Sequence, residues 1–189
     1  AMPELKIAAE ICEDLWVAAP PSVSHAKAGA TVICNLSASD ETVGKSDYRR
    51  TLTSSQSARL LCAYLYADAG EGESTTDMVF AAHNLICENG VILAESKPFG
   101  DGWAQTEIDV AYLAAERRRM TSHIADPDGY ETISFDLNLQ ETTLSRTFDR
   151  EPFIPQNPET RSRRCEDILN IQAHGLAKRV RHAHARSLV

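Results

Sequence analysis

Apolar and polar positions at the start of the chain predict a strand that ends at a cysteine. Residues 5–11 form an apolar, partly β-branched run that is typical of a buried strand. The run stops at Cys12, and the acidic residues Glu13 and Asp14 follow without a turn residue between them. Because ligands of α/β folds bind beyond the carboxyl ends of strands, Cys12 is expected at such an edge. Composition alone equally allows Cys12 to be a small buried apolar residue.

A second strand is predicted close behind the first. Residues 22–28 are expected to form a short helix with Ser22 as its N-cap, and residues 31–36 form the next strand. A strand, a helix and a strand within about 30 residues predict a right-handed parallel crossover. Since neighbouring parallel strands end at the same edge of a sheet, Ser37 and Ser39 are expected to be neighbours of the cysteine.

The middle of the chain carries a strong hairpin signal. Asn89-Gly90 stands between apolar runs at residues 78–86 and 91–95, and Asn-Gly favours a two-residue type I′ turn. The other elements expected around this hairpin are a helix at residues 47–61 capped by Asp47, a strand at 62–67, an irregular polar loop at 68–77, a weak strand at 104–110 and a helix at 112–120.

The last third of the chain has a different pattern. Residues 130–139 alternate enough for an exposed strand, whereas residues 141–160 contain three prolines and no periodicity. We interpret the second stretch as an extended arm or linker. A helix is predicted at residues 161–181, where an apolar stripe is formed by Cys165, Ile168, Leu169, Ile171 and Leu176.

Composition excludes several classes of protein. A chain of 189 residues with 43% apolar residues can bury one good core. Five widely spaced cysteines without a C-x-x-C pair indicate neither a disulfide framework nor a zinc site, and they favour a reducing cytoplasm. No basic-then-apolar leader and no apolar run of about 18 residues is present, so neither secretion nor a membrane is expected. The six histidines show no metal-ligand spacing.

The chain has a net charge of −8, and this charge is unevenly distributed along the sequence. Residues 160–189 hold seven Lys/Arg against two Asp/Glu, a net charge of +5, and residues 1–159 hold 12 against 25, a net charge of −13. An acidic body argues against nucleic acid as a partner. The basic tail is interpreted as a solvated helix, with contact to an acidic surface or a nucleotide-binding domain as the alternative.

The cysteine segment resembles a known family. Ile11-Cys12-Glu13-Asp14-Leu15-Trp16 is similar to the nucleophile segment of the nitrilase superfamily, specifically of the glutaminase domain of glutamine-dependent NAD⁺ synthetases. Further segments resemble the same family in the same order: Asn35-Leu36-Ser37-Ala38-Ser39, Gly44-Lys45, Gln56-Ser57-Ala58-Arg59, residues 69–77, Glu88-Asn89-Gly90 and residues 164–172. Several independent segments at the family's spacing are a far more specific signal than one short motif.

The resemblance implies a fold and a domain organisation. The expected fold class is α/β, as part of a nitrilase-type α-β-β-α sandwich. Residues 1–140 would be the C-terminal portion of the nitrilase-like glutaminase (CN hydrolase) domain. Residues 141–189 would be a linker and helix that lead into a synthetase domain absent from this chain. Part of a sandwich leaves open sheet edges and an uncovered apolar face, so a homo-oligomer is expected.

The resemblance also implies the chemistry. The family hydrolyses the side-chain amide of glutamine with a Glu–Lys–Cys set, and the ammonia serves ATP-dependent amidation of deamido-NAD. Cys12 matches the nucleophile, and the backbone N–H of Glu13 matches a donor of the oxyanion hole. Ser39 and Lys45 match positions that hold the glutamine. Glutamine is the expected partner of this chain, whereas deamido-NAD, ATP and Mg²⁺ would belong to the full-length enzyme, and this chain would hold no cofactor.

The chain departs from the family where catalysis needs a base. The family's catalytic glutamate and lysine lie well upstream of the cysteine, and eleven residues precede Cys12 here. Lys6 lies roughly 20 Å and Glu10 about 6.6 Å back along the strand, so neither replaces them. We therefore expect an excised segment without appreciable glutaminase activity. The alternatives are a stand-alone amidase of the superfamily, which would not need the synthetase-like stretch after residue 150, and a non-catalytic interaction module.

Overall fold

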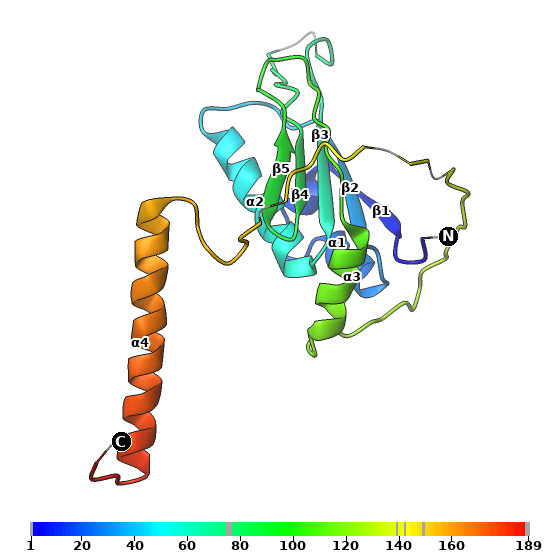
Figure 1. Ribbon diagram of the computed structural model, residues 1–189. Helices are drawn as coiled ribbons and strands as arrows, with labels where there is room; N and C mark the ends of the chain where they lie inside the picture. Colours follow the sequence, from blue (N-terminus) through cyan, green and yellow to red (C-terminus); the bar gives the residue numbers. More distant parts are fainter. Residues whose placement is uncertain (1, 75–76, 139, 142, 149, 188–189) are drawn as a thin grey trace. The chain divides into compact units, whose positions relative to one another are not determined.

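Five strands form one mixed sheet with the order β1-β2-β3-β4-β5 in the computed structural model (Figure 1). The structure describes residues 2–74, 77–138, 140–141, 143–148 and 150–187. The strands are β1 (Ile7–Ile11), β2 (Val32–Ser37), β3 (Ala63–Asp68), β4 (Leu85–Glu88) and β5 (Val91–Glu95). The helices are α1 (Pro21–Lys27), α2 (Lys45–Leu60), α3 (Val110–Arg119) and α4 (Pro158–His182), with a short 3₁₀ helix at Cys12–Leu15.

The first three strands run parallel, and β4 and β5 continue the sheet antiparallel. Ile11 of β1 pairs with Leu36 of β2, and Leu36 pairs with Ala67 of β3. The carboxyl ends of three neighbouring strands therefore meet at one edge of the sheet. The predicted parallel pairing of the first two strands is confirmed.

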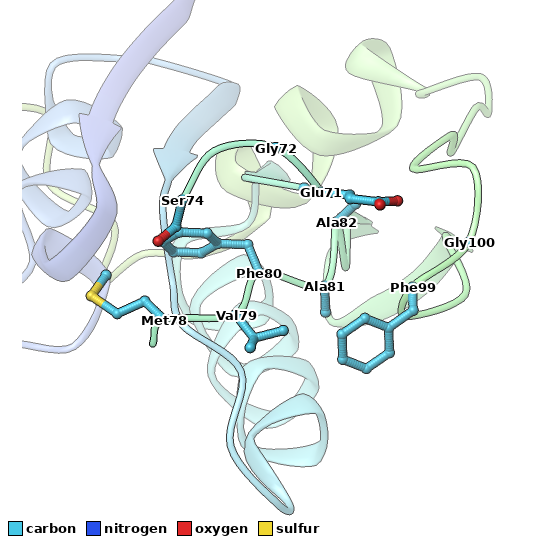
Figure 2. Close-up of a pocket in the computed structure, with 11 residues that line it drawn as sticks. Glu71, Gly72, Ser74, Met78, Val79, Phe80, Ala81, Ala82, Phe99 and Gly100 are labelled. Atoms are coloured by element: carbon cyan, nitrogen blue, oxygen red, sulfur yellow. The ribbon is translucent and has the colours of Figure 1, made fainter. Parts of the chain in front are cut away.

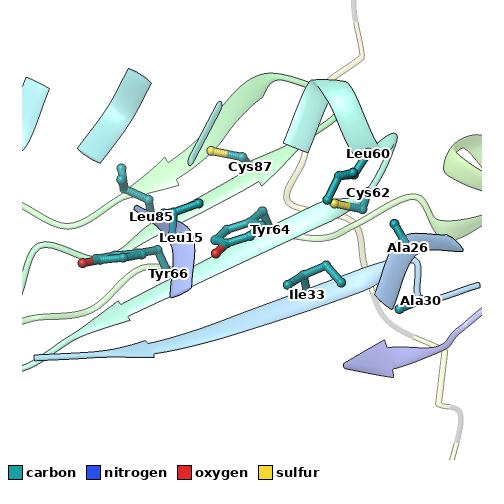
Figure 3. Close-up of a cluster of buried hydrophobic side chains, with 10 residues drawn as sticks. All are labelled: Leu15, Ala26, Ala30, Ile33, Leu60, Cys62, Tyr64, Tyr66, Leu85 and Cys87. Carbon is teal, nitrogen blue, oxygen red and sulfur yellow. The ribbon is translucent and has the colours of Figure 1, made fainter. Parts of the chain in front are cut away.

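Helices cover both faces of this sheet. Side chains that alternate along the strands divide between the faces. On one face, the sheet packs against α1 and α2 in the main core (Figure 3), whose buried members are Leu15, Ala26, Ala30, Ile33, Leu60, Cys62, Tyr64, Tyr66, Leu85 and Cys87. On the other face, Leu113 of α3 packs against Val32 and Ala63 in a smaller cluster.

Strand β1 is less buried than its composition predicts. Ile7 is 53% exposed and Ile11 is 68% exposed, whereas Glu10 between them is 2% exposed. β1 is an edge strand in the order of the sheet, and its apolar side chains lie on the face that α3 covers only near Val32 and Ala63. Leu36 on the same face is also 58% exposed. The expectation of a buried strand is therefore wrong for this face.

The start of helix α1 also differs from the prediction. The helix begins at Pro21, with Pro20 as the N-cap residue, so Ser22 lies inside the first turn. Proline is well suited to the first helical position because its missing N–H would have no intrahelical partner. The Ser22 hydroxyl is buried and accepts a hydrogen bond from Gln56 Nε2 at 2.8 Å instead of capping the helix.

The Asn89-Gly90 hairpin is confirmed. Asn89 has a φ of 45° and Gly90 a φ of 87°, the two positive values that a type I′ turn requires. The antiparallel pair that it joins is shorter than predicted, because β4 begins only at Leu85. Thr75 and Thr76, which fall in the polar loop predicted at residues 68–77, lie outside the described residues.

Two predicted strands are wrong. Residues 104–109 have no regular structure and lead directly into α3 at Val110. Residues 130–138 have no regular structure and are exposed, and Leu139 lies outside the described residues. Alternation of apolar and polar residues is not enough for a strand, because a strand also needs a neighbouring backbone with which to form hydrogen bonds.

The chain separates into two compact units, Ala1–Ser145 and Arg146–Val189. The second unit contains α4, whose first turn is capped by the Asn157 side chain accepting from Thr160 N at 2.9 Å. Pro158 at the first helical position starts this helix earlier than the predicted residue 161. The predicted apolar stripe is present but exposed, with Ile168, Leu169, Ile171 and Leu176 each more than half accessible.

Candidate active site at Cys12

Cys12 lies on a constrained turn directly after β1. Its φ of 50° falls in the left-handed region that side chains rarely adopt. The Asp14 carboxylate accepts from Ile11 N at 2.7 Å, and the Asn35 side chain donates to Cys12 O at 3.2 Å. The backbone of the cysteine is thus held from both sides, and a strained conformation held in this way is common at functional sites.

A shallow depression of about 430 Å³ lies at the carboxyl ends of the three parallel strands. Its lining residues come from the ends of β1, β2 and β3 and from the loop after β3: Ile11, Cys12, Leu36, Ser37, Ala38, Ala67, Asp68, Ala69 and Glu73. The predicted neighbourhood of Cys12 and Ser37 is confirmed, because both residues line this depression. It is the place in the fold where ligands of parallel sheets bind.

Ser39 is buried and does not belong to the lining of the depression. Ser39 is 4% exposed, and its backbone N–H donates to Asp68 Oδ1 at 2.9 Å. Asp68 itself lines the depression. Burial raises the pKa of the Asp68 carboxyl, and the Ser39 N–H and the Arg49 charge oppose that rise. Asp68 was missed in the sequence, although it ends β3 as Ser37 ends β2.

Lys45 lies apart from the lining of the depression, beside the turn that follows Cys12. Its Nζ donates to the backbone O of Asp40 at 2.6 Å and to Asp40 Oδ1 at 2.7 Å. The same ammonium lies 5.6 Å from the centroid of the Trp16 ring, and Trp16 follows the 3₁₀ helix. The hydrogen bond from Lys45 holds the pKa of Asp40 below its usual value.

The two glutamates nearest Cys12 in the sequence have different surroundings. Glu13 is exposed in the 3₁₀ helix. Glu10 is buried on the α1 side of the sheet, where one carboxylate oxygen accepts from Ser22 N at 2.7 Å and the other from the Tyr64 hydroxyl. Both oxygens of Glu10 are engaged in holding α1 and β3 against β1, which is a structural role.

A second pocket of about 300 Å³ lies away from the cysteine (Figure 2). The loop after β3, the segment before β4 and the loop at Phe99 enclose it, with apolar side chains from Met78, Val79 and Phe80. Glu71 and Ser74 are the ionisable and hydroxyl side chains of its lining, which holds no thiol, imidazole or amine among the described residues. The depression at Cys12 is therefore the better candidate for nucleophilic chemistry.

The described part of the chain contains neither a candidate membrane span nor a candidate metal site. No helix there combines the length and the apolar character needed to cross a bilayer. Within those residues, no three His, Cys, Asp or Glu side chains gather closely enough to hold a metal ion.

Selective thiol labelling tests the placement of the cysteines. Iodoacetamide is expected to modify Cys12 and the exposed Cys165 in the folded chain. Cys62 and Cys87 are expected to stay unmodified, because both are 0% exposed and burial raises the pKa of each thiol to about 12. Peptide mass mapping measures the modified fraction, and labelling in urea, which should reach all five cysteines, is the control. Modification of Cys62 at the rate of Cys12 would contradict this assignment.

Curated relatives match nearly the whole chain. The glutamine-dependent NAD(+) synthetase of Mycobacterium tuberculosis is 41% identical over 191 residues, which cover 95% of this chain and 28% of that protein. The glutamine-dependent NAD(+) synthetase of Mycobacterium leprae is 43% identical over 183 residues, which cover 91% of this chain and 27% of that protein. The chain thus spans little more than a quarter of the length of each of these two relatives. No family model matches the chain.

A solved structure shares the fold. The NitFhit protein of Caenorhabditis elegans aligns with a TM-score of 0.50 and 20% sequence identity, covering 60% of this chain and 27% of that chain. Together with the mixed sheet and its flanking helices, this likeness confirms the predicted fold class, an α/β fold that forms part of a nitrilase-type sandwich.

Proposed function

Because this chain is homologous to one region of the glutamine-dependent NAD(+) synthetases, we propose that it forms the cysteine-bearing part of a glutaminase site. The observation that carries the proposal is the position of Cys12 in the depression where β1, β2 and β3 end. A thiol on a strained turn at this edge is suited to attack an amide carbonyl presented from solvent.

The proposed reaction proceeds through a thioester. The Cys12 thiolate attacks the side-chain carbonyl carbon of glutamine, a C–S bond forms, and the carbonyl oxygen becomes an oxyanion. The backbone N–H of Glu13 would donate to that oxyanion, since the first N–H groups of a helical turn have no acceptor within the turn. The C–N bond then breaks, ammonia leaves with an added proton, and water releases glutamate from the thioester.

Substrate binding would involve the loop before α2. Ser39 and Lys45 would hold the α-carboxylate of glutamine, in line with the roles expected for them. Lys45 is bound to Asp40, so it would exchange that carboxylate for the one of the substrate.

Proton transfer would come from groups outside these residues. Glu10 keeps both oxygens in hydrogen bonds on the α1 side, and Lys45 is bound to Asp40. A positioned general base is worth roughly 10²–10⁴ in rate. The glutamate and lysine that the family uses would complete the site, and ammonia would then serve ATP-dependent amidation of deamido-NAD elsewhere in the full-length enzyme.

Trapping with a glutamine-shaped chloroketone tests the proposal. The reagent keeps the α-ammonium and α-carboxylate of glutamine and carries a chloromethyl ketone in place of the side-chain amide. A thiolate beside the bound reagent is alkylated at the chloromethyl carbon, and chloride leaves. We expect saturable labelling of Cys12 when the chain is mixed with the part of the Mycobacterium tuberculosis relative that precedes the matched region. Excess glutamine should protect Cys12, and the exposed Cys165 serves as an internal control that glutamine does not protect. Equal labelling of both cysteines, without protection, would contradict the proposal.

A further inference from the structure

The guanidinium of Arg49 is fully buried under the loop that precedes α2. Its side chain is 0% exposed on the inner face of the helix, where Thr53, Gln56 and Ser57 are also buried. A buried cation is costly unless hydrogen bonds and opposite charges compensate it. The partners of Arg49 therefore indicate what the burial is for.

Two partners of Arg49 come from different segments. Nη1 contacts His83 Nδ1 at 2.7 Å, and Nη2 forms an ion pair with Glu41. Because a guanidinium can only donate, His83 Nδ1 must accept, and the ring proton is therefore on Nε2. Nε2 donates in turn to Glu95 Oε1 of β5 at 2.6 Å. Arg49 thus joins the loop before α2 to the segment before β4 and to the sheet.

The loop fixed by Glu41 is the one that carries the proposed substrate-binding residues. Residues 38–44 connect β2 to α2 without a strand or helix of their own. Their described tertiary contacts are few: the Ser39 N–H donates to Asp68 Oδ1 at 2.9 Å, and the Glu41 N–H donates to Val79 O at 2.6 Å. The charge of Arg49 also acts on Asp68, the carboxylate that accepts from the Ser39 N–H.

We propose that Arg49 is a positioning residue that holds residues 39–45 against the segment before β4 and thereby places Ser39 and Lys45 for binding of the α-carboxylate of glutamine. The inference rests on the proposed function, because the placement of this loop matters for substrate only if these two residues hold it. Arg49 itself lies under the loop and would not touch the substrate.

A positioning role and a purely structural role have different consequences. Loss of a structural ion pair lowers the stability of the whole unit and leaves the affinity of the folded protein for its ligand unchanged. Loss of the positioning contact releases the loop locally, so more ligand is needed for half-saturation while the chemistry at Cys12 keeps its maximal rate.

The experiment compares four variants with the unmodified chain. Arg49→Met removes the positive charge and keeps a side chain of similar length. Arg49→Lys keeps the positive charge but lacks the several N–H donors of the guanidinium, and Glu41→Gln removes the negative charge of the partner on the loop. Arg59→Met is the matched control, since Arg59 is an exposed arginine of the same helix whose described partner is Gln56. Amide hydrogen exchange of the chain and saturable chloroketone labelling of Cys12 in the mixture described above are measured for each.

Arg49→Met and Glu41→Gln are expected to speed exchange of the Ser39 and Glu41 amides at least 10-fold and to raise the half-saturating concentration at least 10-fold. The maximal labelling rate should stay within twofold. Arg49→Lys should recover part of both effects, and Arg59→Met should show neither. Glu41→Gln and Arg49→Lys keep the test valid if Arg49→Met does not fold, because both leave the buried site occupied by a polar side chain.

Unchanged exchange at residues 39–41 in the variants would overturn the inference. Faster exchange with an unchanged half-saturating concentration would overturn the positioning role and leave a structural contact. Absence of saturable labelling in the unmodified chain is a separate result, because it would overturn the proposed function and with it the substrate part of this inference.

Discussion

Incubated with glutamine, the 189-residue chain is expected to release ammonia no faster than its Cys12→Ala variant. The reason is that the glutamate and lysine of the family's set are not found near Cys12: Glu10 and Lys45 are engaged in other contacts, and the acids that line the depression with Cys12 are Asp68, which accepts from the Ser39 N–H, and Glu73 on the loop after β3. Without a positioned general base, attack of the thiol and departure of ammonia are each slowed, by roughly 10²–10⁴ in total rate.

Supplying the missing groups should restore that factor. When the part of the Mycobacterium tuberculosis relative that precedes the matched region is added, ammonia release is expected to rise by roughly 10²–10⁴ with the unmodified chain. The mixture with Cys12→Ala should stay at background. A coupled assay for ammonia measures both. Turnover by the isolated chain above the Cys12→Ala background would show that these residues already hold a working base.

Replacing Arg117 by methionine is expected to lower the free energy of unfolding by about 3 kcal/mol. Arg117 is 9% exposed, and its guanidinium donates to the backbone oxygens of Leu61 at 2.9 Å, Ala30 at 2.6 Å and Leu60 at 3.0 Å. Two of these carbonyls lie at the end of α2, where backbone oxygens have no helical partner. Methionine would leave all three buried and unpaired, and a charged hydrogen bond is worth about 1.5–3 kcal/mol.

The hydrogen bonds of Arg117 also help to attach α3 to the sheet. Arg117 extends from α3 to the end of α2 and the start of β2, next to the small cluster around Leu113. Urea unfolding of Arg117→Met and of the exposed neighbour Arg118→Met measures the effect. The second variant should stay within about 0.5 kcal/mol of the unmodified chain. A loss below about 1 kcal/mol for Arg117→Met would mean that water replaces the guanidinium at these carbonyls.

Local sequence signals predicted the elements that depend on local chemistry. Asn89-Gly90 forms the expected turn because few residues other than asparagine and glycine accept its two positive φ values. The neighbourhood of Cys12 and Ser37 followed from the parallel crossover, since topology alone brings the two strand ends together. The strand predicted at residues 130–139 failed because no neighbouring strand pairs with the part that is described.

Long-range polar contacts were beyond prediction from periodicity. The inner face of α2 buries Arg49 and Gln56 beside the apolar Leu60, a combination that helical periodicity does not predict. The partners that make this possible, such as Glu41 and His83, lie outside the helix and carry no helical spacing. The place of Lys45 escaped prediction for the same reason, because its ion pair with Asp40 follows from the shape of the loop.

The left-handed backbone conformation of Cys12 lowers the stability of the fold. Any residue with a Cβ in that conformation is disfavoured by about 1–2 kcal/mol relative to glycine, which has none. A glycine at this position would therefore make the protein harder to unfold while removing the thiol proposed as the nucleophile. A selection for thermostability alone would therefore disfavour the cysteine. The cause would be its backbone conformation and not any contact of the sulfur atom.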